Sequence, residues 1–85
     1  MKPYGIRFTK EAVKDFHTLA PKLQQTLREI LTQSISHDPH CGKPSVGDLA
    51  GFFSYRLTYK DRIVYSVDEA TKTIFIHRTR THYGE

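Results

Sequence analysis

Residues 51–67 decide the fold, and they read GFFSYRLTYKDRIVYSV. Apolar side chains occupy every second position on either side of a turn at residues 59–61, a period of two that is typical of half-buried strands. The odd-numbered positions carry the apolar set, which comprises Phe53, Tyr55, Leu57, Ile63, Tyr65 and Val67. The sequence therefore predicts an antiparallel hairpin with one face in the core, and with Arg56 and Arg62 together on the other face.

The segments on both sides of this hairpin extend the pattern. A second turn at residues 68–72 leads into a third strand over residues 73–80. Ile74 and Ile76 favour one orientation of that strand and Phe75 the other, so the direction of Arg78 and Arg80 stays open. Upstream, residues 36–50 hold two prolines and two glycines without any periodicity, which predicts a long loop.

The first 35 residues predict a strand and two helices. Residues 4–9 alternate as a strand does, and Thr9 stands where the N-cap of a helix belongs. Apolar residues then recur at helical spacing up to residue 20, and Pro21 opens a second helix that runs to Ile35. We therefore expect an α+β fold of order β-α-α-β-β-β, in which a two-helix hairpin covers one face of an antiparallel sheet and leaves the arginine-bearing face open.

Length and charge limit the functions that are feasible. The chain has 85 residues and a net charge of +4, so we expect a single domain spanning residues 1–85, too small to enclose a nucleotide cofactor. The basic excess favours a polyanionic partner. Cys41 is the only cysteine, and neither a signal pattern nor an apolar span is present, so we expect a protein of the reducing cytoplasm without contact to a membrane.

The C-terminal residues 77–85, HRTRTHYGE, carry the richest chemistry. Guanidinium groups bind phosphate oxygens, imidazole moves a proton near neutral pH, and a tyrosine ring stacks on a base. A frayed terminus without any function is the alternative reading. His37, His40 and Cys41 lie close together but fall short of the three or four ligands that a zinc site needs, so we expect no metal and no cofactor.

The runs LAGFFSYRL (residues 49–57) and DRIVY (residues 61–65), together with the terminal His82-Tyr83, resemble the RelE/ParE superfamily of toxins from bacterial type II toxin–antitoxin systems. The likeness is to its YoeB-like and RelE-like mRNA interferases. It implies an endoribonuclease that cuts messenger RNA in the A site of the 70S ribosome and that a cognate antitoxin neutralises. The partner is expected to be acidic or amphipathic and to cover the helices or the basic face.

The resemblance also implies roles for individual residues. Arg62 matches the arginine that stabilises the phosphate, His82 the general acid, and Tyr83 the tyrosine that orients or stacks on the substrate. YoeB-like enzymes carry a glutamate base where this chain has Ser45, which leaves Asp48 as the nearest carboxylate for that role. The residues assigned to RNA binding are Lys43, Arg56, Arg78 and Arg80.

Three other functions remain open at this stage. A ParE-like toxin that inhibits gyrase would damage DNA and leave messages intact, whereas a plain RNA-binding module would bind RNA without cutting it. A third reading is a domain whose basic face only contacts another protein.

Overall fold

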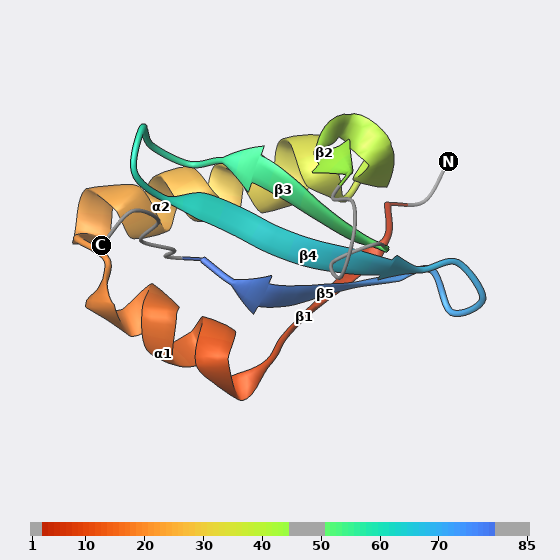
Figure 1. Cartoon of the computed structure of the whole chain (residues 1–85), viewed down its shortest axis with the longest axis horizontal. Helices are drawn as coiled ribbons and strands as arrows, with labels where there is room; N and C mark the ends of the chain where they lie inside the picture. Colours follow the sequence, from red (N-terminus) through yellow and green to blue (C-terminus); the bar gives the residue numbers. More distant parts are fainter. Residues whose placement is uncertain (1–2, 45–50, 80–85) are drawn as a thin grey trace.

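Residues 3–44 and 51–79 are described by the structure, a computed structural model, and within them two helices cover one face of a five-stranded sheet (Figure 1). The strands are β1 (Gly5–Phe8), β2 (Lys43–Pro44), β3 (Phe52–Arg56), β4 (Arg62–Asp68) and β5 (Thr73–Arg78). Their order in the sheet is β1-β5-β4-β3-β2, and β1 runs parallel to β5 while the other neighbours are antiparallel. The predicted α+β class is confirmed, with β2 as an additional strand.

Both helices begin where the sequence predicts. The Thr9 side chain caps α1 (Lys10–Thr18) by accepting a hydrogen bond from the Ala12 amide at 3.2 Å. Pro21 is the first residue of α2 (Pro21–Ile30), and the helix continues as a π-helical turn over Leu31–Ile35. Figure 1 shows α2 crossing behind β3 and β4, and Leu27 of this helix is fully buried in the core.

The core lies between the helices and the odd-numbered side chains of the central hairpin. Ile63 and Tyr65 of β4 are fully buried there, as is Leu27 of α2. Burial of such side chains, at about 1.5–3 kcal/mol each, is the main stabilising contribution in a chain of this size. Ile74 and Ile76 of β5 face the same core, which settles the orientation that the sequence left open: Phe75 lies on the other face.

A β-bulge interrupts the pairing of β4 with β5. Tyr65 pairs with Ile76, but the preceding residue of β4, Val64, pairs with Arg78, so His77 is the extra residue. The strict alternation of faces therefore ends at Ile76, although β5 itself continues to Arg78.

Tyr65 fastens the predicted loop to the core face. Its hydroxyl donates to the Pro39 carbonyl oxygen at 2.8 Å and accepts from the Gly42 amide at 3.0 Å. Burial raises the pKa of the Tyr65 hydroxyl far above its ordinary value. The described part of the loop, residues 36–44, forms a 3-10 turn over Pro39–Cys41 and then enters β2.

Candidate functional site

The sheet face away from the helices, called the open face below, is basic. The strand register places Lys43 beside Ser54, Arg56 beside Arg62, and Phe75 beside both Arg7 and Ser66. Its polar and charged members from β1 to β5 include Arg7, Lys43, Ser54, Arg56, Arg62, Ser66, Asp68, Thr73 and His77. Arg7, Lys43, Arg56 and Arg62 are all exposed. Asp68, at the turn end of the face, accepts hydrogen bonds from the amides of Ala70 and Thr71.

Arg56 and Arg62 form the centre of the candidate site. They stand directly opposite one another on β3 and β4, which confirms the prediction that they share a face. The turn between the strands is closed by hydrogen bonds from the Leu57 and Thr58 amides to the Asp61 carbonyl oxygen at 3.0 and 3.1 Å. Like charges at directly opposite positions destabilise a sheet by up to about 1 kcal/mol, and an anion bound by both would reverse that effect.

His77 is a member of the open face to which sequence reasoning assigned no role of its own, although it begins the C-terminal stretch singled out above. Its imidazole stacks on the Phe52 ring, with centroids 4.8 Å apart and an angle of 12° between the rings, and its Nε2 lies 2.8 Å from the Ser66 hydroxyl oxygen. The Thr9 hydroxyl donates to the His77 carbonyl oxygen at 3.2 Å. The His77 imidazole is thus held in place by Phe52 of β3 and Ser66 of β4. The signal for it is the apolar run Ile74-Phe75-Ile76, which breaks the alternation just before the bulge.

Arg78 is held by a carboxylate of α1. Its Nε and Nη2 donate to the two Asp15 carboxylate oxygens at 2.7 and 3.2 Å, and the Thr79 amide donates to the same carboxylate at 3.2 Å. This paired geometry is the strong form of an arginine–carboxylate contact. Part of the Arg78 charge is therefore offset by Asp15, and its assignment to RNA binding stays a prediction.

Four of the predicted site residues lie outside the described residues: Asp48, Arg80, His82 and Tyr83. So does Ser45, the position at which related enzymes have a glutamate. The meeting of His82 with the arginine pair accordingly stays a prediction. Of the assigned set, the structure brings together Arg56 and Arg62, and adds Lys43 on the neighbouring strand of the same face.

Other reactive groups of the described chain do not assemble a second centre. No group of three or more His, Cys, Asp and Glu side chains in residues 3–44 and 51–79 is arranged to hold a metal ion. Burial raises the pKa of the Cys41 thiol, and nearby Asp38 adds to that shift, which is the reverse of what an activated nucleophile requires. None of the helices in this part of the chain has the length and apolarity that crossing a bilayer requires.

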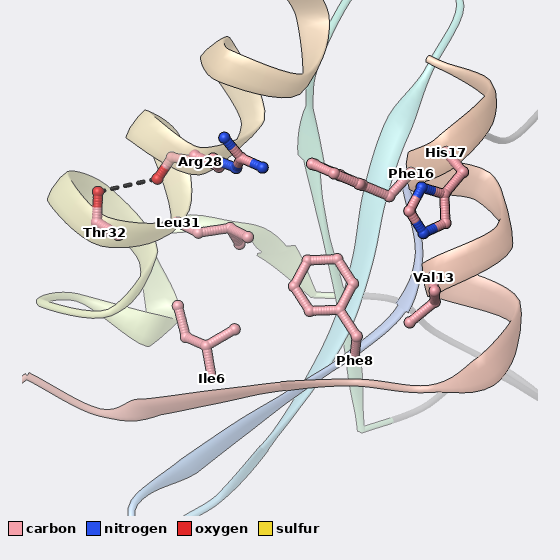
Figure 2. Close-up of a pocket in the computed structure, with 8 residues that line it drawn as sticks. All are labelled: Ile6, Phe8, Val13, Phe16, His17, Arg28, Leu31 and Thr32. Atoms are coloured by element: carbon pink, nitrogen blue, oxygen red, sulfur yellow. Dashed lines mark hydrogen bonds between the residues drawn. The ribbon is translucent and has the colours of Figure 1, made fainter. Parts of the chain in front are cut away.

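A second surface, the helix-side groove, lies between β1, α1 and α2. It encloses about 500 Å³, and Figure 2 shows its lining residues: Ile6, Phe8, Val13, Phe16, His17, Arg28, Leu31 and Thr32. Phe8 and Val13 keep 36% and 41% of their surface exposed there, so the groove presents apolar side chains from both β1 and α1. The Arg28 guanidinium carbon lies 5.3 Å from the centroid of the Phe16 ring, so a cation borders the apolar lining.

Comparisons with known proteins match this chain to bacterial toxins and to chains of toxin–antitoxin complexes. The family model described as ParE-like toxin of type II bacterial toxin–antitoxin system matches residues 6–83. Toxin RelG of Mycobacterium tuberculosis (strain ATCC 25618 / H37Rv) is 38% identical over 78 residues, which cover 89% of this chain and 87% of that protein. Among solved structures, a chain of the toxin–antitoxin complex RelBE2 from Mycobacterium tuberculosis superposes with a TM-score of 0.84 at 36% identity, over 94% of this chain and 98% of that chain. A chain of the YoeB-YefM complex from Staphylococcus aureus gives a TM-score of 0.79 at 25% identity, over 94% and 98%.

Proposed function

Because the chain belongs to the ParE-like toxin family of type II bacterial toxin–antitoxin systems, we propose that it acts as an endoribonuclease on messenger RNA. The observation that supports this proposal is the pair of exposed arginines, Arg56 and Arg62, directly opposite one another on the open face. Two guanidinium groups at that spacing suit the oxygens of one phosphodiester. The proposed substrate is message in the ribosomal A site, where the ribosome would hold the strand in line for reaction.

The proposed reaction uses the RNA's own 2′-hydroxyl as nucleophile. Its oxygen attacks the adjacent phosphorus while the bond from phosphorus to the 5′-oxygen breaks, and the products are a 2′,3′-cyclic phosphate and a 5′-hydroxyl. Arg56 and Arg62 stabilise the negative charge that develops on the phosphoryl oxygens. His82 donates the proton to the leaving 5′-oxygen, Tyr83 orients the substrate, and Asp48 is the candidate base for the 2′-hydroxyl proton.

We also propose that a cognate antitoxin covers the helix-side groove. Two chains of similar structure come from toxin–antitoxin complexes, RelBE2 and YoeB-YefM. The exposed Phe8 and Val13 call for an apolar partner surface, and the guanidinium of Arg28 beside them favours an acidic side chain on that partner. An amphipathic segment with one carboxylate next to its apolar stripe meets both requirements.

The test of the catalytic proposal is expression of Arg62→Ala in cells, with message 5′ ends mapped by sequencing. Wild type should produce cuts at A-site codons, and loss of one charge-stabilising arginine should reduce the cleavage rate by about 10²–10³-fold. Lys22→Ala, which removes a charge from α2 on the other side of the sheet, is the matched control and should cleave as wild type does.

Two results would contradict the proposal. Cleavage that survives both Arg56→Ala and Arg62→Ala would separate the reaction from the open face. Intact messages together with DNA damage in cells expressing wild type would favour the second candidate, a ParE-like inhibitor of gyrase, which the ParE name of the family model keeps in consideration.

A further inference from the structure

A polar groove, called the β3-edge groove below, runs along the outer edge of β3 on the side where β2 begins. Within the described chain β2 pairs with β3 only at Lys43–Ser54 and Pro44–Phe53. The Gly42 amide turns away to Tyr65, so the backbone leaves the strand edge at that point. The space that opens beyond it encloses about 550 Å³ and is lined by Cys41, Gly42, Lys43, Ser54, Tyr55, Arg56, Leu57, Thr58 and Tyr59. That volume falls within the usual range of small-ligand sites.

The charges of this groove are continuous with those of the open face. Arg56 lines the groove and also stands opposite Arg62, so it belongs to both surfaces. Lys43 lies beside Ser54 on the neighbouring strand, and it is exposed. An extended anionic chain held at the arginine pair would therefore find a further cation as it enters the groove.

The groove also carries an aromatic ring that the core does not use. Tyr59 stands in the turn between β3 and β4 with 83% of its surface exposed, and the Lys60 ammonium lies 5.7 Å from the ring centroid. At that exposure the Tyr59 ring contributes little to the packing of the core. Exposed aromatic rings beside cationic side chains are how proteins hold single-stranded nucleic acid, since every base has a face on which such a ring can stack.

We propose that the β3-edge groove is a nucleotide subsite for single-stranded RNA. It takes the nucleotide next to the phosphate that Arg56 and Arg62 hold: Tyr59 stacks on its base and Lys43 contacts the following phosphate. The inference rests on RNA as the proposed ligand, but not on cleavage of that RNA. A stacked base would fix the strand on one side of the scissile bond and thereby contribute to its alignment.

The chain offers a direct probe because it contains no tryptophan. Tyr59→Trp introduces a single reporter in the groove, and a 2′-O-methyl single-stranded RNA oligonucleotide serves as a ligand that cannot be cut. Binding should quench the emission of Tyr59→Trp in a saturable way. Phe8→Trp places the matched reporter in the helix-side groove, where the same oligonucleotide should leave the emission unchanged.

Affinity measurements on protein without a tryptophan reporter complete the test. By anisotropy of a labelled oligonucleotide, Tyr59→Ala should weaken binding about tenfold, while Tyr59→Phe, which keeps the ring, should bind as wild type does. Lys43→Ala should lower the magnitude of the slope of log affinity against log salt by about 0.7, the value for one phosphate contact with a single strand.

The outcomes separate this inference from the proposed function. An unquenched Tyr59→Trp reporter on a protein that binds the oligonucleotide, or equal affinities of wild type and Tyr59→Ala, would overturn the subsite and leave the nuclease proposal standing. Failure of wild type to bind the oligonucleotide would overturn the subsite as well. Quenching with a tenfold loss in Tyr59→Ala would support the subsite even if no message is cut in cells.

Discussion

At the scale of single residues, Gly42 and Tyr65 depend on one another. A Cβ atom at position 42 would overlap the Tyr65 hydroxyl and lie 2.9 Å from the Ser54 carbonyl oxygen, so only glycine fits where β2 approaches the core. The same hydroxyl holds the Pro39 carbonyl and the Gly42 amide. The buried Tyr65 hydroxyl thus holds Gly42 in place and thereby positions the next residue, Lys43, on the open face.

Two substitutions test this arrangement by urea unfolding. Tyr65→Phe should lower the free energy of unfolding by about 1–3 kcal/mol, because it leaves a buried amide and a carbonyl without their partner. Gly42→Ala should cost at least as much, since backbone as well as side chain must move. Gly5→Ala is the matched control: its Cβ would meet nothing nearer than the Lys72 carbonyl oxygen at 4.0 Å. Equal stability of Gly42→Ala and Gly5→Ala would refute the argument.

At the scale of elements, the sequence predicted the structure correctly where the apolar side chains show a regular period, and failed where they do not. Side chains alternate along residues 53–57 and again along residues 63–67, on either side of one short turn, so the face of Arg56 and Arg62 follows from counting. Counting fails at His77, where the bulge adds a residue. It also cannot detect β2, whose two residues show no period and pair with residues nine and eleven positions further along the chain. The proposed roles of His82 and Tyr83 came only from a motif, because two terminal residues have no pattern of their own.

The turn between β4 and β5 is tied to two other segments through Glu69. Its carboxylate accepts from the Tyr4 hydroxyl at 2.7 Å, lies 3.0 Å from Nε2 of His40, and is 3.6 Å from the Lys72 ammonium. The hydrogen bond from Tyr4, then that from His40, lowers the pKa of Glu69 below its ordinary value. A carboxyl whose pKa is depressed by folding stabilises the fold above its unfolded-state pKa, and this contribution is lost as the pH falls through the folded-state pKa.

Tyr4→Phe tests this network because it removes the largest cause of the shift. The pKa of Glu69, followed by NMR titration of its side-chain carboxyl carbon, should rise toward its ordinary value. Stability measured between pH 3 and 6 should then depend less on pH than in wild type. A pKa that stays where it was would mean that the Tyr4 hydroxyl does not hold the carboxylate in solution.

At the scale of the whole molecule, chemistry is divided between the two sides of one sheet. The open face gathers exposed cations from four strands, whereas the helix-side groove gathers apolar side chains with Arg28 at its border. Phe8 and Phe75 illustrate the division, since β1 and β5 send these rings to opposite faces. A substrate and a partner protein can therefore use different surfaces of an 85-residue chain.

This division predicts that the two functions separate by mutation. Val13→Asp places a charge in the helix-side groove at a side chain that is 41% exposed, so the fold should tolerate it. The variant should remain toxic in cells that co-express the antitoxin, because an apolar partner surface would have to desolvate the new carboxylate, while the arginine pair is unchanged. Arg62→Ala should show the reverse, with no toxicity and undiminished co-purification with the antitoxin. If Val13→Asp is still neutralised, or if Arg62→Ala alone releases the antitoxin, the partner lies over the arginines instead, and inhibition works by covering the RNA site.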